Sequence, residues 1–250
     1  MPSINPSATY KRTALVLLNT VLGEMGMPAI SSVNSTDDMA VQLVALANGF
    51  GTRLASLPLW AELNKTATIT TVQGTSTYDL PIDWLVPLHG TAWNRSASWP
   101  LAGPIAPVHW QTLQSGVGAG ATSSYRYRFV GGQVQLHTGA VSTGEALVFD
   151  YLSSEWVLGV DGEGLATVGK PRISADNDYI LLHEEMFITG LKVAWRAEKG
   201  FEYSRHLAEF LQMLEAAWAN SSGAAVLSFI PNSAQQFLSL RNVPDSGYGS

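Results

Sequence analysis

The sequence predicts an α+β fold, in which N- and C-terminal helices form an α-helical bundle and an antiparallel β domain is inserted between them. Helical periodicity of apolar residues occurs near both ends of the 250-residue chain, whereas short segments of alternating, β-branched residues fill its middle. The final segment has no lasting period. We therefore expect four parts: N-terminal helices in residues 1–60, a β-sandwich or barrel-like domain in 61–172, C-terminal helices in 173–222, and an extended C-terminal tail in 223–250.

Two amphipathic helices are predicted near the N-terminus. Apolar residues at three- and four-residue spacing in 13–25 predict the first helix. This helix is expected to end at a segment that contains two glycines and a proline. The second is predicted to start at Ser35, three residues before an acidic residue, and to stop before Pro58. Gly49 and Gly51 weaken this helix by roughly 1 kcal/mol each relative to alanine, so we expect close packing against them.

About six or seven short strands are predicted between residues 66 and 153. Three hairpins are expected there: two strands around a Gln-Gly turn in 66–81, a hairpin with a Ser-Ala-Ser turn in 85–101, and a hairpin around Gly131-Gly132 in 125–138. A short helix is expected in 106–114 and a further strand in 146–153. The glycine-rich segment 154–171 is expected to be mostly loop.

Two more helices are predicted after this segment. The first runs from about Asp178, with an apolar stripe that ends at Trp195, and it stops at Gly200 behind a basic last turn. The second runs from about Glu202 to Asn220. The charges at the joint between them are expected to pair within the corner or with a neighbouring copy; these are Arg196, Lys199, Glu202 and Arg205.

The tail combines glycine, proline and serine with apolar residues that a solvated linker would not carry. We therefore expect it to bind a partner in extended form. Its candidate contact residues are Val226, Leu227, Phe229, Ile230, Phe237 and Leu238.

The composition favours a protein that is covered by other copies of itself. Charged residues make up 14% of the chain, against about 25% in an average protein. The formal net charge of −6 and the lack of a basic run argue against sequence-specific nucleic-acid binding. There is no cysteine, which excludes disulfides and thiolate chemistry. No signal-peptide or membrane-spanning run is present, so we expect a soluble protein made in a cytoplasm.

No motif predicts an enzyme, a metal site or a cofactor. The segment HEEMF, from His183 to Phe187, lacks the second histidine of a zinc helix, and the glycines of 115–124 lack the strand and helix of a phosphate loop. A catalytic carboxylate pair could be chosen from Asp79, Asp83 and Asp150, but nothing in the sequence selects two of them. Exposed tryptophans of a β-sandwich could bind sugars by stacking, which is one alternative. Burial is the commoner arrangement for tryptophans and is expected for Trp93, Trp99, Trp110 and Trp156.

Four segments in order resemble the bacteriophage head-to-tail adaptor proteins of short-tailed phages, the tail tubular protein A-like family. They are WNRSASWPLAGP (93–104), YRYRFVGGQVQL (125–136), FDYLSSEWVL (149–158) and GLKVAWRAEKGFEY (190–203). With the surrounding helices the likeness covers about residues 13–228.

The resemblance implies a structural virion protein in the neck of a phage, without catalysis. Such adaptors form a ring, typically of twelve copies, between the portal protein and the tail nozzle. The ring lines the DNA exit channel, and the C-terminal tail climbs onto the portal. Another neck or tail-tube component is the nearest alternative. A virion protein that binds or cleaves peptidoglycan is a more distant one.

Overall fold

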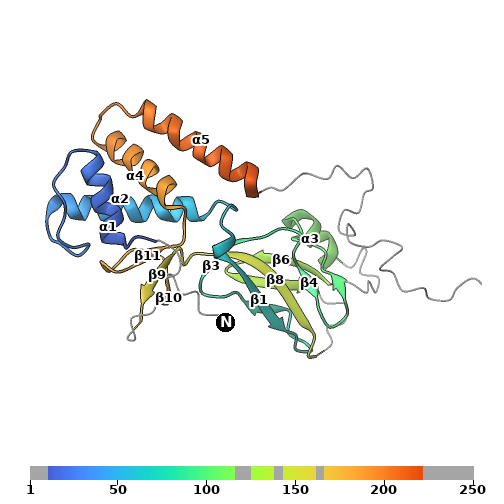
Figure 1. Cartoon of the computed structure of the whole chain (residues 1–250). Coiled ribbons are helices and arrows are strands. Elements are labelled where there is room, and N and C mark those ends of the chain that lie inside the picture. The colour runs from blue at the N-terminus through green and yellow to red at the C-terminus, as the bar shows by residue number, and fades with distance from the viewer. Residues whose placement is uncertain (1–10, 116–124, 138–142, 162–165, 222–250) are drawn as a thin grey trace, which may run out of the picture.

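The computed structural model describes residues 11–115, 125–137, 143–161 and 166–221. Within these ranges the long helices gather at one end of the molecule, and most strands lie at the other end together with the short helix α3 (Pro107–Gln114) (Figure 1). Helices from the two ends of the chain pack together, and antiparallel sheets lie between them in sequence. This arrangement confirms the predicted α+β fold.

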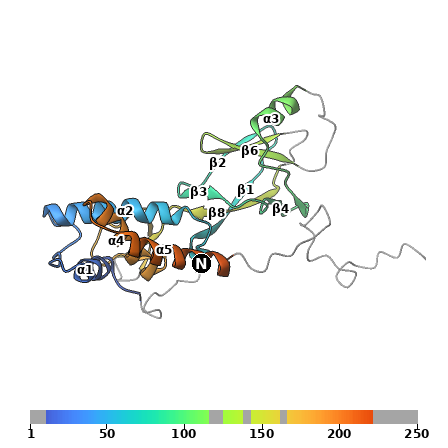
Figure 2. The same ribbon diagram turned by 90° about the horizontal axis from the view of Figure 1, so that it is seen from above.

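The helical end contains four long helices around one apolar core. They are α1 (Ala14–Glu24), α2 (Asp38–Ala55), α4 (Glu184–Glu198) and α5 (Ser204–Ser221). Helix α4 lies in the middle and contacts the other three. The view from above shows α2, α4 and α5 side by side (Figure 2).

Helix α2 begins three residues later than the serine signal predicted. The hydroxyl of Ser32 and the backbone N–H of Val33 both donate to a carboxylate oxygen of Asp176, at 3.1 and 2.6 Å. These bonds hold the segment before the helix in a turn. Ser35 accepts from the N–H of Asp37, which precedes the first helical residue. A contact with a distant segment thus overrides a local start signal.

A chain of aromatic rings links the elements of the helical core. Trp156 packs 5.9 Å from Phe187, which lies 5.7 Å from Phe50, and Phe50 lies 5.8 Å from Phe210. Two glycines make room for these rings: a Cβ at Gly51 would overlap the indole of Trp156, and one at Gly190 would overlap Phe50. Gly49 has open space around it, so the expected close packing exists at Gly51 alone.

The β end is a sandwich of two antiparallel sheets. The larger contains β1 (Asn64–Thr70), β3 (Trp84–Pro87), β4 (Trp93–Asn94), β5 (Trp99–Pro100) and β8 (Ala146–Ser153); the smaller contains β2 (Thr77–Asp79), β6 (Arg126–Val130) and β7 (Gln133–His137). A shared apolar cluster fills the space between them; it includes Ile69, Tyr127, Val134 and Phe149. Burial raises the pKa of Tyr127 to about 12.

The two hairpins around 96–98 and 131–132 are confirmed, and both central glycines of the second have positive φ. The short helix is α3 (Pro107–Gln114); a 3-10 turn spans Ala61–Leu63. The hairpin predicted in 66–81 is wrong. All seven residues of β1 pair with β8, whereas β2 pairs with β7 of the other sheet. The turn at Gln73-Gly74 therefore carries the chain from one sheet to the other.

The loop predicted in 154–171 is also wrong. This region contains β9 (Val157–Val160) and β10 (Ala166–Lys170), which form a third sheet with β11 (Tyr179–Ile180). This sheet lies under the helices, and Val157 and Ile180 belong to the helical core. The helix predicted from Asp178 therefore starts later, at Glu184. The buried carboxylate of Asp178 instead accepts from the N–H groups of Ser174 and Ala175 and from Lys170.

Strand β8 joins the two cores. Its Leu147 and Phe149 lie in the sandwich, whereas Leu152 contributes to the helical core. At this junction Lys65 bridges two carboxylates, with Nζ 2.6 Å from Asp83 and 2.7 Å from Glu155.

Asp83 also accepts from the hydroxyls of Tyr151 and Ser153, at 2.8 and 2.7 Å. Burial alone would raise the pKa of Asp83, but the hydrogen bonds from Lys65, Ser153 and Tyr151 together lower it. Burial alone would lower the pKa of Lys65, but its two carboxylate partners raise it.

Substitution of the two α2 glycines by alanine should have opposite effects. Gly49→Ala should raise the free energy of unfolding by about 0.5–1 kcal/mol, because alanine loses less backbone entropy in a helix and nothing lies near its Cβ. Gly51→Ala should lower it by roughly 1–3 kcal/mol, because the Trp156 ring must move. Urea unfolding measures both. Equal effects at the two positions would contradict this packing.

Lys65→Met should destabilise the protein by roughly 1–2 kcal/mol at neutral pH, because two carboxylates lose their cation at a partly solvated site. The lowered pKa of Asp83 stabilises the fold above its ordinary value of 3.8, and this contribution is lost as pH falls through the lowered pKa. The raised pKa of Lys65 stabilises it below 10.5, and this contribution is lost above the raised pKa.

The stability difference between wild type and Lys65→Met should therefore be flat between about pH 4 and 10 and shrink in acid. Chemical unfolding at pH 2 and pH 7 measures it, with the exposed Arg53→Met as control. A difference that persists unchanged at pH 2 would rule out this account.

Candidate assembly surface

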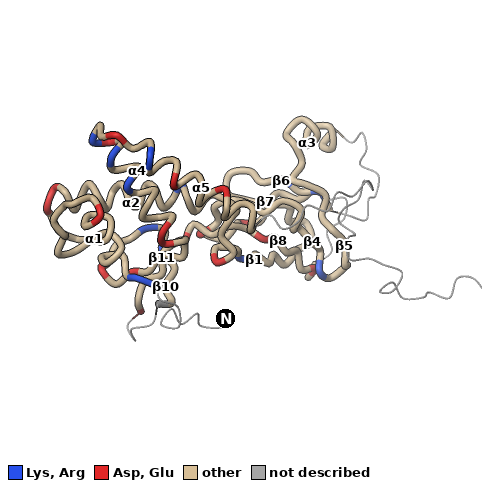
Figure 3. Tube along the Cα trace, turned by 45° about the horizontal axis from the view of Figure 1, so that its top comes forward, with Lys and Arg blue, Asp and Glu red and all other residues tan. Residues whose placement is uncertain are grey.

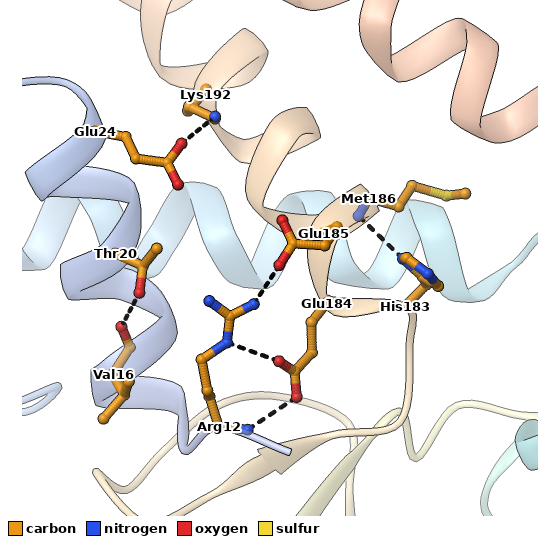
Figure 4. A network of polar contacts seen from close by, with 9 residues as sticks. All are labelled: Arg12, Val16, Thr20, Glu24, His183, Glu184, Glu185, Met186 and Lys192. Carbon is orange, nitrogen blue, oxygen red and sulfur yellow. Dashed lines mark hydrogen bonds and ion pairs between the residues drawn. The ribbon is translucent and has the colours of Figure 1, made fainter. Parts of the chain in front are cut away.

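Helix α4 is fastened to the N-terminal part of the chain at its first turn (Figure 4). The backbone N–H of Arg12 donates to one carboxylate oxygen of Glu184 at 2.9 Å, and its Nε donates to the other at 2.8 Å. A second nitrogen of Arg12 reaches Glu185 at 2.6 Å. His183 precedes the helix, and its Nδ1 accepts from the N–H of Met186 at 3.3 Å. The HEEMF segment is thus the polar start of a helix.

Two lysines fasten the rest of α4. Lys192 forms an ion pair with Glu24 at the end of α1. Lys199 donates to the side chain of Gln42 on α2 at 2.6 Å, and its Nζ lies 4.9 Å from the ring centre of Trp195. Helix α4 is therefore fixed against both N-terminal helices along its length, which fixes the position of the corner that follows it.

Gly200 ends α4 as predicted. Its φ is +71°, the left-handed conformation that favours glycine. The N–H of Gly200 donates to the carbonyl of Ala197 at 3.2 Å, and the N–H of Phe201 donates to the carbonyl of Arg196 at 2.9 Å. This pair of bonds is a Schellman motif, which turns the chain sharply from α4 into α5.

The four charged residues predicted at this corner all find partners within their own chain. Arg196 donates to the backbone carbonyl of Glu202 at 2.8 Å. The Glu202 carboxylate accepts from the N–H of Ser204 at 2.8 Å, and hydrogen bonds from Ser204 lower its pKa. Arg205 pairs with Glu209 one turn later at 3.1 Å, and Lys199 bonds to α2 as described. Figure 3 shows these blue and red positions gathered at the α4–α5 corner.

A pocket of about 320 Å³ opens beside this corner; it is lined by Met25, Met27, Trp195, Arg196, Phe201 and Glu202. Within the described part of the chain, the buried Nε1 of Trp195 and Nε of Arg196 have no hydrogen-bond partner. A buried N–H without an acceptor costs roughly 1–3 kcal/mol. No sequence pattern indicates this pocket, because its two methionines follow α1 and lie far from the corner in sequence.

Apolar side chains stay exposed around the corner and along α5. Phe201 and Tyr203 are exposed before α5, and Leu211 and Trp218 are about half exposed on it. Leu211 and Trp218 are seven residues apart and so share a face. The six apolar tail residues predicted as contacts lie outside the described residues.

The structure assembles no catalytic cluster from the candidates. Asp83 is held by Lys65, Asp150 accepts from Thr66 at 2.7 Å, and Asp79 accepts from Gln133 at 2.6 Å. No group of three potential metal-ligating side chains occurs among the described residues, and no helix described here is long and apolar enough to cross a membrane.

The four tryptophans predicted to be buried divide in their exposure. Trp110 and Trp156 are buried, Trp93 is partly buried, and Trp99 is exposed at the β4–β5 hairpin.

Comparison with known proteins assigns the chain to a family. The sequence model of one family, the SU10 adaptor protein, matches residues 12–228. The chain belongs to this family. The match spans all four long helices and both sheets of the sandwich, and it confirms the resemblance to phage head-to-tail adaptors. No curated protein matches the chain.

Membership of the SU10 adaptor family gives the chain a structural role as a phage head-to-tail adaptor. In the adaptor, the helical end and the sandwich are linked by the Lys65 junction, and the α4–α5 corner lies away from the sandwich (Figure 1). The matched segment includes the corner and the exposed face of α5, and it ends among the first apolar residues of the tail.

Replacement of Gly200 should destabilise the adaptor by an amount that depends on backbone preference alone. Gly200→Ala should lower the free energy of unfolding by about 1 kcal/mol, because alanine disfavours positive φ. Gly200→Asn should cost less, since asparagine tolerates that conformation. No atom lies near the position of the new Cβ, so a larger loss with asparagine than with alanine would refute this assignment.

Proposed function

We propose that the chain forms a ring, typically of twelve copies, between the portal protein and the tail nozzle of a phage virion. The ring lines the channel through which the genome leaves, and the subunit performs no catalysis. It is made in the host cytoplasm and joins the virion during assembly. The family match over residues 12–228 carries this proposal.

A ring requires each copy to present two different faces to its neighbours. The low charge of the chain and the exposed apolar face of α5, with Leu211 and Trp218, support such contacts. Burial of these side chains between copies would remove apolar surface from water. The helical bundle then forms the ring wall and the sandwich projects from it.

The charged corner supports contact with a neighbouring copy or with the portal. The side chain of Arg205 is 87% exposed, although it pairs with Glu209. An exposed pair of this kind contributes little to stability and can exchange partners at low cost. We assign Arg196, Lys199, Glu202 and Arg205 to this edge of the interface.

The tail is assigned to the portal. Residues 222–240 carry no charge, and the six apolar contact residues lie among them. Such a segment gains free energy when it covers an apolar groove on a partner. The net charge of −6 suits a channel wall that DNA passes without binding.

Truncation after Ser222 should leave a folded chain that no longer joins portal rings, because the six apolar contact residues are removed. Co-sedimentation with purified portal rings measures binding, and circular dichroism confirms the fold. The full chain bound to portal should show twelve-fold symmetry in electron micrographs. Unimpaired co-sedimentation of the truncated chain would remove the tail from the portal contact, and a particle without ring symmetry would overturn the ring.

A further inference from the structure

The pocket beside the α4–α5 corner has the features of a peptide-binding site. Its apolar wall consists of Met25, Met27 and Phe201, and methionine side chains adapt to varied shapes. Two of its lining side chains, Trp195 and Arg196, carry buried N–H groups that have no acceptor within the described residues. Trp195 is 2% exposed, so solvent does not satisfy its indole N–H. The pocket therefore suits a ligand that has an apolar group with hydrogen-bond acceptors beside it.

An extended peptide supplies both. A bulky apolar side chain of the peptide would pack against the apolar wall. Main-chain carbonyls on either side of it would accept from the N–H groups of Trp195 and Arg196. An anionic ligand is less suitable, because Glu202 also lines the pocket and Arg196 already donates to the carbonyl of Glu202.

We infer that this pocket binds the chain's own tail, through Phe229 and Ile230, before the tail meets its partner. Residues 222–240 carry no charge, and Pro231 disfavours a helix at Ile230, which keeps the segment suited to extended binding. The tail sequence thus offers bulky apolar side chains, and an extended segment would present its main-chain carbonyls to the pocket.

The length of the tail fits this site. The 18 residues of α5 rise about 1.5 Å each and span about 27 Å, and an extended chain covers about 3.3 Å per residue. A tail that turns back along α5 therefore returns to the corner after about eight residues, close to Phe229. On the way it passes the length of α5, where Leu211 and Trp218 are half exposed.

Tethering makes a weak site sufficient. A segment attached by a short linker has an effective concentration in the millimolar range, so it occupies a pocket of modest intrinsic affinity. A partner that binds the tail more tightly releases it. Within the proposed function, that partner is the portal, and the pocket keeps the apolar segment covered in the free subunit.

Disulfide trapping in the full-length chain tests the inference, because the chain has no cysteine of its own. Met27→Cys places a thiol in the pocket, and Ser228→Cys places one in the tail beside Phe229. Under mild oxidation at low protein concentration, this pair should form a disulfide within one chain at least roughly five-fold faster than a control pair. The control combines Ser228→Cys with Val108→Cys, on the exposed surface of α3.

A second measurement uses a single thiol. The alkylation rate of Met27→Cys should rise several-fold when Phe229→Asp and Ile230→Asp are added, because the charged tail no longer covers the pocket. If Met27→Cys does not fold, Phe201→Cys, at an exposed position of the same pocket, replaces it in both measurements. An unchanged alkylation rate would overturn the inference.

Disulfide-linked dimers in place of an internal disulfide would also overturn it, since the occupant would then be the tail of another copy. Equal trapping rates for the test and control pairs would do the same. These outcomes are independent of the ring: portal co-sedimentation of the unmodified full-length chain reports on the proposed function, and its absence while internal trapping persists would refute the portal contact alone.

Discussion

The contact between Trp156 and the backbone of α2 is the constraint on which the helical end depends. The indole occupies the space that a Cβ at position 51 would need, so only glycine fits there. The indole packs against Phe187, which in turn packs against Phe50. The lack of a side chain at Gly190 likewise lets the ring of Phe50 pack against α4. Because each ring rests on the next, the distances between the third sheet, α2 and α4 are set together, as expected in a close-packed interior.

This constraint also positions the sandwich. Trp156 lies three residues after the end of β8, and β8 runs from the sandwich core into the helical core. The Lys65 ion pairs fix the same point from the side of β1. A rigid joint of this kind transmits position from one end of the subunit to the other, which is what a protein that connects two parts of a particle requires. The α4–α5 corner is held in turn by Arg12, Lys192 and Lys199, so the proposed contact surfaces lie on fixed elements.

Local signals in the sequence were sufficient wherever local bonds decide the structure. The Gly200 stop, the Gly131-Gly132 hairpin and α5 all follow from residues within a few positions of each other. Prediction failed where distant residues decide: Asp176 moves the start of α2, and β9 finds its partners β10 and β11 without a distinctive alternation. The charged corner was predicted as a cluster, but its partners were not, because side-chain pairing depends on tertiary geometry. The pocket joins two distant segments and has no sequence signature.

The bond between Arg12 and Glu184 bears on how the chain is made. These residues are 172 positions apart, and contacts so distant in sequence form slowly because a long loop must close. The strands of the sandwich, from β1 to β8, leave the ribosome well before α4 and α5 do. The sandwich can thus serve as a folded intermediate during synthesis, while α1 and α2 wait with their apolar faces uncovered. Helices α4 and α5 are synthesised last, and their packing covers the apolar faces of α1 and α2.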